Sequence, residues 1–166
     1  RWGDAYLVTM STDQENRRAE VLADWHILTD RFDMDGWQVQ LTLRLGEEVA
    51  YETSVPVIGA HHRFRFTVEN AQLWWPRGYG AQPLYDATLT LRDRDGTVLA
   101  TKTQRIGLRT IRLVRRDITP DQAGEFVFVV NGEKVFARGS NWVPLDALHS
   151  RDPQHLAGAM AMIRDL

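Results

Sequence analysis

The sequence contains no cysteine among its 166 residues. Disulfide bonds and thiolate metal sites are therefore excluded, and the redox environment stays open. The chain also has no apolar run near the roughly 18 residues that a membrane span requires. We therefore expect no membrane partner. No secretory signal is visible, which leaves the compartment open between the bacterial cytoplasm and secretion.

The chain also lacks a strong charge of either sign, because 20 basic residues stand against 22 acidic ones and the net charge is −2. This balance gives no reason to expect nucleic acid or an anionic membrane as a partner. With 43% hydrophobic and 25% charged residues, the composition is that of a globular protein. The length suits one ordinary domain with a further segment.

Alternation of apolar and polar residues with a period of two dominates the first two thirds of the chain. In residues 37–45, for example, every second side chain from Trp37 to Leu45 is apolar. Asp95 and Gly96 mark a turn between two further strands. We predict strands at residues 5–11, 20–28, 37–45, 49–55, 64–68, 85–92, 98–106 and 108–115.

Short strands with one apolar face each bury those faces as two sheets packed face to face. The sequence therefore predicts a mainly β protein, with an immunoglobulin-like β-sandwich over residues 1–116. The usual core disulfide of such a domain is absent. We expect the buried aromatic side chains of Trp25 and Trp37 to fill its place.

Residues 70–84 interrupt the strand pattern, because prolines and glycines surround Trp74 and Trp75. Flat aromatic faces suit the C–H side of a sugar ring, so this loop could belong to a free-standing carbohydrate-binding module. The simpler interpretation is that the two tryptophans pack on the sandwich or dock a neighbouring domain.

His61 and His62 precede a predicted strand. Adjacent strand residues point to opposite faces, so the pair cannot easily share a metal ion. No third ligand stands at a suitable spacing. We interpret both histidines as a solvated loop pair, and we predict no metal site and no cofactor.

Residues 117–166 are predicted to form a separate segment. Pro120 and Gly124 indicate a linker. Asn131-Gly132 follows, between two apolar, β-rich runs, and this arrangement is a strong hairpin signal. The run at 126–130 is apolar on both faces, so we expect both faces to be covered.

The last part of the chain predicts a strand followed by a helix. The strand is expected at residues 134–140, and Asp152 with Pro153 marks the start of the helix. Such a unit opens an α/β fold and cannot close a sheet by itself. We therefore expect an incomplete (β/α)₈ barrel, since a whole barrel takes about 250 residues.

Three residues after the predicted strand are candidates for substrate binding. In a barrel, side chains at the carboxyl ends of the strands line the active site. Asn141 suits a bond to a sugar hydroxyl, Trp142 a pocket wall, and Asp146 a hydrogen-bond acceptor. The alternative is that Asn141 and Asp146 satisfy backbone groups of their loop. Our candidates for domain docking are Trp74, Trp75, Phe126 and Phe128.

Three motifs stand out in the second half of the chain, WWPRGYGAQPLY at residues 74–85, IGLRTI at 106–111 and FVVNGEKVFARGSNWVP at 128–144. They resemble motifs of glycoside hydrolase family 2, and of its β-mannosidase branch in particular. They occur in the order in which the family has them. The second is similar to the strand that closes the family's immunoglobulin-like domain, and the third to its hairpin and first barrel strand.

The resemblance implies a retaining exo-glycosidase that removes terminal β-linked mannose. β-Glucosaminidases have a similar Trp-Trp-Pro loop, so their specificity is an alternative. The family's two catalytic glutamates sit on later barrel strands, so we expect no catalytic residue before Leu166. The chain would then be an inactive, domain-positioning piece of a parent enzyme. Its partners would be the carbohydrate substrate and neighbouring domains of the same chain.

Overall fold

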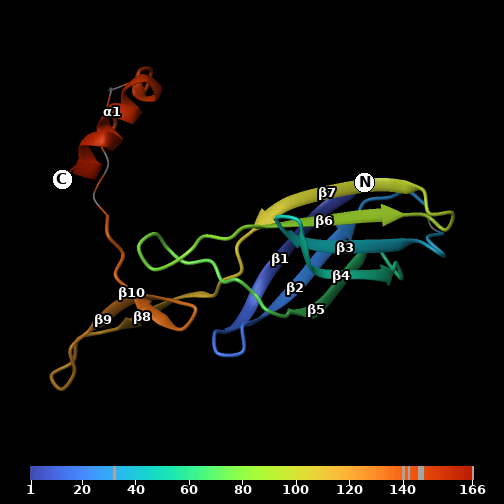
Figure 1. Ribbon diagram of the computed structural model, residues 1–166, viewed down its shortest axis with the longest axis horizontal. Helices are drawn as coiled ribbons and strands as arrows, with labels where there is room; N and C mark the ends of the chain where they lie inside the picture. The colour runs from blue at the N-terminus through green and yellow to red at the C-terminus, as the bar shows by residue number, and fades with distance from the viewer. Residues whose placement is uncertain (32, 140, 142, 146–147, 166) are drawn as a thin grey trace. The chain divides into compact units, whose positions relative to one another are not determined.

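The computed structural model describes residues 1–31, 33–139, 141, 143–145 and 148–165 (Figure 1). It divides into two compact units, Arg1–Phe136 and Ala137–Leu166. Within the described residues, the first unit holds the strands and the second holds the helix.

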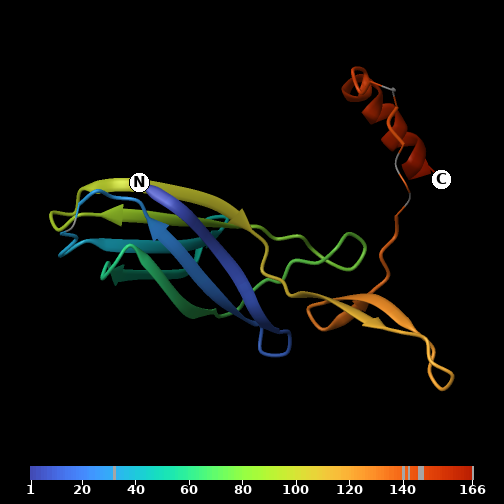
Figure 2. The same ribbon diagram turned by 180° about the vertical axis from the view of Figure 1, so that it is seen from behind.

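A β-sandwich makes up most of the first unit, and Figure 2 shows it from behind. One sheet has the antiparallel order β1-β2-β5, and the other has the antiparallel order β4-β3-β6-β7. The strands are β1 (Trp2–Asp13), β2 (Arg18–Ile27), β3 (Gln38–Leu45), β4 (Glu48–Pro56), β5 (His61–Val68), β6 (Tyr85–Arg92) and β7 (Val98–Ile106). The predicted mainly β fold and its sandwich are confirmed.

The core of the sandwich lies where the period-two pattern places it. In β3, Val39, Leu41 and Leu43 are fully buried, while the residues between them point outward. Trp25 and Trp37 are 1% and 7% exposed, so both fill the core as predicted.

A second, smaller sheet belongs to the same unit. It contains β8 (Ile111–Arg116), β9 (Glu125–Val130) and β10 (Glu133–Val135), in the order β10-β9-β8. Asn131 and Gly132 join β9 to β10 with φ angles of 50° and 91°. Positive φ at both central residues is what a two-residue type I′ hairpin requires. The predicted hairpin is therefore confirmed.

Strand β8 differs from its prediction, because the strand expected at 108–115 was assigned to the sandwich. It pairs instead with β9, in a register that places Leu113 opposite Phe128. Residues 117–124 are consequently the loop of a hairpin rather than an interdomain linker. The boundary predicted after residue 116 thus falls between two paired strands.

The strand expected at residues 134–140 is also shorter than predicted. β10 ends at Val135, and residues 136–139 have no regular secondary structure. β10 is short because it only completes the hairpin, with Lys134 opposite Val129.

The second unit contains helix α1 (Asp152–Asp165), which begins at the predicted residue. Asp152 lies in its first turn and Arg164 in its last, so both charges oppose the helix dipole favourably. None of its described residues is buried. No helix in the described ranges combines the length and apolar character of a membrane crossing.

Candidate domain-docking site

The loop that carries the two tryptophans, residues 70–84, runs from the end of β5 to the start of β6. We call it the tryptophan loop. Tyr85, the first residue of β6, ties down the start of this loop. Its buried hydroxyl accepts a hydrogen bond of 2.8 Å from the backbone N–H of Gln72. Immunoglobulin-like domains use a tyrosine in this manner to tie a loop to the sandwich. Burial raises the pKa of the Tyr85 hydroxyl, so it stays neutral at physiological pH.

Replacing Tyr85 with phenylalanine should lower the free energy of unfolding by about 1 kcal/mol, because one net hydrogen bond is lost. Urea unfolding measures this change, and amide exchange at Gln72 should become faster. Tyr51→Phe is the matched control. The Tyr51 ring stacks on Phe66 at 4.1 Å, a contact that phenylalanine keeps. Equal losses in the two variants would contradict the role of the Tyr85 hydroxyl.

Trp74, in the tryptophan loop, is half-buried against the residues that follow β7. Its backbone N–H donates to the Leu108 carbonyl at 2.9 Å. The Arg109 guanidinium lies 4.5 Å from the centre of the indole ring, in a cation–π contact. Gly107 approaches so closely that an added Cβ would lie 3.0 Å from the Trp74 Cβ. The ring is thus covered on one side by its own chain, which favours packing over sugar stacking.

Trp75 is also half-buried, and it packs inside the loop itself. Its backbone N–H donates to the Ala81 carbonyl at 2.9 Å. A Cβ added to Gly80 would lie 2.9 Å from the indole, so the loop closes tightly over this ring. The tight packing holds the loop in one shape.

Asn131 is the central residue of the site, and it is only 3% exposed. Its Oδ1 accepts from the Thr110 backbone N–H, and its Nδ2 donates to the Trp74 carbonyl, both at 3.0 Å. Its backbone N–H donates to the Thr110 carbonyl at 3.0 Å. Its backbone carbonyl accepts from Gln14 Nε2 at 2.6 Å. All four polar groups therefore join the hairpin turn to other segments of the unit.

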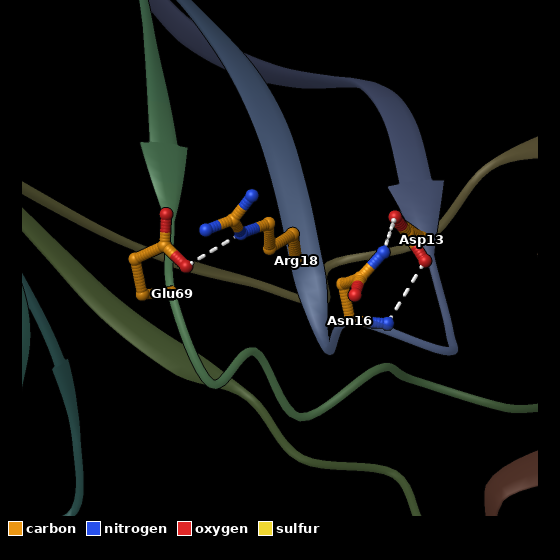
Figure 3. A network of polar contacts seen from close by, with 4 residues as sticks. All are labelled: Asp13, Asn16, Arg18 and Glu69. Atoms are coloured by element: carbon orange, nitrogen blue, oxygen red, sulfur yellow. Dashed lines mark hydrogen bonds and ion pairs between the residues drawn. The ribbon is translucent and has the colours of Figure 1, made fainter.

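The turn that carries Gln14 is itself fixed by polar contacts (Figure 3). The Asp13 carboxylate accepts from Asn16 Nδ2 at 2.7 Å and from its backbone N–H at 3.0 Å. These bonds, the side-chain bond first, lower the pKa of Asp13. Beside the turn, Arg18 Nε donates to Glu69 at 2.7 Å and links β2 to the turn that follows β5. Gln14 consequently reaches Asn131 from an ordered turn.

A second contact joins the tryptophan loop to the far end of the hairpin. The Phe136 backbone N–H donates to the Tyr79 hydroxyl at 2.8 Å. Tyr79 is held near the tip of the loop by a hydrogen bond from its backbone N–H to the Pro76 carbonyl. The loop thus contacts the hairpin both at Asn131 and at Phe136, on either side of β10.

One face of the small sheet is apolar and exposed. The register of β8 with β9 puts four exposed apolar side chains on this face, together with buried Val130 and with Arg115 opposite Phe126, and we call it the phenylalanine face. Its residues and their exposed fractions are Ile111 (54%), Leu113 (47%), Phe126 (71%) and Phe128 (38%). Among the described residues of this unit the expectation that both faces of β9 are covered is therefore not met, although Val129 on the opposite face is buried.

The predicted substrate-binding residues belong to the second unit. Asn141 is exposed there. Trp142 and Asp146 lie outside the described residues. Their binding of a sugar stays a prediction, as does the docking role of Trp74, Trp75, Phe126 and Phe128.

A polar cluster centred on Asp24 of β2 is not indicated by the sequence. His61 and His62 lie in β5 rather than in a loop, on opposite faces. His62 stacks on Trp25 at 5.2 Å, and His61 Nε2 lies 2.9 Å from Asp24 Oδ1. Arg63 Nε donates to Asp24 Oδ2 at 2.6 Å. Burial alone would raise the pKa of Asp24, but the hydrogen bonds from Arg63 and His61 outweigh it and lower the pKa.

This cluster has the form of a structural ion pair on the outer side of the sheet. Asp24 is 4% exposed, whereas the Arg63 and His61 side chains are both 58% exposed. Across the part of the chain that the structure describes, no group of three or more His, Asp or Glu residues could hold a metal ion.

Comparison with known proteins places the chain among glycoside hydrolases. Residues 7–109 match the family described as Glycosyl hydrolases family 2. β-Mannosidase B of Aspergillus niger is 35% identical over 144 residues, which are 80% of this chain and 16% of that protein. The matched family region ends just before β8, so it corresponds to the sandwich.

Two solved structures share the fold. The β-D-mannosidase of Dictyoglomus thermophilum has a TM-score of 0.68 and 27% identity, over 88% of this chain and 18% of that one. The exo-chitosanase of Amycolatopsis orientalis has a TM-score of 0.54 and 21% identity, over 87% of this chain and 16% of that one. The chain spans about a sixth of the length of the curated relatives that it matches.

Proposed function

The chain belongs to glycosyl hydrolases family 2, and on that premise we propose that it is the immunoglobulin-like segment of a retaining exo-glycosidase resembling β-mannosidase. The parent enzyme would hydrolyse terminal β-linked mannose. The 35% identity over 144 residues to β-mannosidase B carries this proposal. A β-glucosaminide specificity has weaker support, because the exo-chitosanase is similar at 21% identity only, which speaks for the fold alone.

The role of this segment would be to position other parts of the enzyme. A retaining mechanism uses two carboxyl groups about 5–5.5 Å apart, and the acid catalyst needs a raised pKa. In this chain the hydrogen bond from Lys134 lowers the pKa of Glu125, which is the opposite of what the acid catalyst needs. Glu69 pairs with Arg18 and Glu52 accepts from Gln40. We place the reacting glutamates in the part of the relatives that this chain does not cover.

The phenylalanine face would dock the catalytic barrel. Exposed apolar surface is typical of an interaction site, and Phe126 and Phe128 contribute the two aromatic side chains of this face. The sandwich would end near residue 109 instead of 116, because β8 pairs with β9. The hairpin sheet would follow, and then the first strand–helix unit of the barrel, with α1 as its helix.

We expect the purified 166-residue chain to release no nitrophenol from 4-nitrophenyl β-D-mannoside or from the β-D-glucosaminide. A longer protein that contains this chain and a complete barrel should hydrolyse the mannoside faster than the glucosaminide. Turnover by the 166-residue chain alone would refute the positioning role. A preference of the longer protein for the glucosaminide would refute the mannoside specificity.

A further inference from the structure

We propose that Asn131 is a positioning residue, which fixes the orientation of the β8–β10 sheet on the sandwich. This inference rests on the proposed positioning role and deepens it. It names the residue through which the sandwich holds the β8–β10 sheet.

A turn alone would not need the side-chain contacts of Asn131. A type I′ turn requires only a positive φ, which glycine supplies at no steric cost. Asn70 has the same φ of 50° after β5, yet it is exposed. Asn131 is buried instead, and its amide joins two segments outside the hairpin, at Thr110 and at Trp74.

The hydrogen-bond partners of Asn131 lie in three different segments of the first unit. Thr110 lies between β7 and β8, Trp74 in the tryptophan loop, and Gln14 in the turn between β1 and β2. A buried polar group that loses its partner costs free energy, so these bonds hold one geometry strongly. The bond from Phe136 to Tyr79 adds a second fixed point beyond β10. Two separate attachment points restrict rotation of the small sheet.

The test compares Asn131→Gly with Asn70→Gly in the 166-residue chain. Both variants make the same chemical change at the same backbone φ, but only Asn131→Gly removes buried side-chain bonds. Residual dipolar couplings of backbone N–H groups report the orientation of each sheet. In the wild type and in Asn70→Gly, one alignment tensor should fit the sandwich and the β8–β10 sheet together. In Asn131→Gly, the two parts should require different tensors.

Asn131→Asp provides a chemical rescue that a general loss of stability would not show. At neutral pH the introduced carboxylate can accept from Thr110, but it cannot donate to the Trp74 carbonyl. When protonated it regains a donor, and burial should let this happen at or above about pH 5. We expect two tensors at pH 7.5 and a return to one tensor on acidification.

The possible outcomes separate the two proposals. If the small sheet of Asn131→Gly unfolds, the role of Asn131 is tested by Asn131→Asp alone. Recovery of a single alignment tensor at low pH then supports that role. One tensor in Asn131→Gly, or no pH dependence in Asn131→Asp, overturns that role but leaves the positioning function intact. Two tensors in the wild type would overturn both, because the sandwich would then not hold the hairpin.

Discussion

Replacing Trp25 with alanine should lower the free energy of unfolding by about 3–5 kcal/mol, the range found for large aromatic residues in cores. Trp25 is 1% exposed, so nearly its whole indole surface is buried. It stacks on His62 at 5.2 Å and meets Phe64 edge-on at 5.6 Å. The substitution would leave a cavity among these packed side chains, which adds to the lost burial.

Trp75→Ala is the control for this prediction, because it deletes the same side chain from the half-buried tryptophan loop. Its loss of stability should be much smaller, since solvent can fill the space. Urea unfolding followed by far-ultraviolet circular dichroism measures both, without relying on tryptophan fluorescence. Equal losses would show that Trp25 is not the main support of the core.

Two strands of the sandwich could be predicted closely from the sequence. β6 has the predicted bounds of residues 85–92, and β7 those of residues 98–106. In β6 a change of one residue in register would turn the buried apolar set outward, so the alternating pattern specifies the register. Gly96, with a φ of 82°, lies in the turn that the Asp-Gly pair indicates.

The partner of β8 could not be predicted in the same way. Its residues alternate weakly, with Ile111 and Leu113 on one face and Val114 on the other. Such a pattern indicates a strand but fits either sheet, since pairing is decided by contacts outside the strand. The sandwich was therefore assigned one strand too many, and the hairpin loop at 117–124 was interpreted as a linker.

The hydrogen bonds of Asn131 and Asp24 could not be predicted from the sequence for a related reason. Asn131 was recognised as a turn residue, but its partners Thr110, Trp74 and Gln14 lie 21, 57 and 117 positions away. Asp24 and its partner Arg63 are separated by 39 positions. A local pattern identifies a polar residue on a strand or turn, but only the packed sheets bring such distant groups together.

Lowering the pH should destabilise the chain through Asp24. The hydrogen bonds from Arg63 and His61 hold the folded-state pKa of Asp24 below its ordinary value of 3.8. A carboxyl group of this kind stabilises the fold above its unfolded pKa, and this contribution is lost as the pH falls through the folded pKa. Asp24→Asn should therefore cost about 1–2 kcal/mol at neutral pH, because charge-assisted hydrogen bonds become neutral ones. Below the folded pKa its deficit should disappear.

Arg63→Met should lose less stability than the wild type on acidification, and this difference tests whether the ion pair is responsible. Methionine keeps apolar cover over Asp24 but removes the Arg63 cation, so only His61 still opposes the effect of burial and the folded pKa of Asp24 should rise above its wild-type value. The deficit of Arg63→Met relative to the wild type is therefore largest at neutral pH and shrinks as the pH falls through the raised pKa. Urea unfolding between pH 7.5 and about pH 3 measures all three proteins. A wild-type acid response in Asp24→Asn, or a deficit in Arg63→Met that does not shrink on acidification, would contradict the assignment.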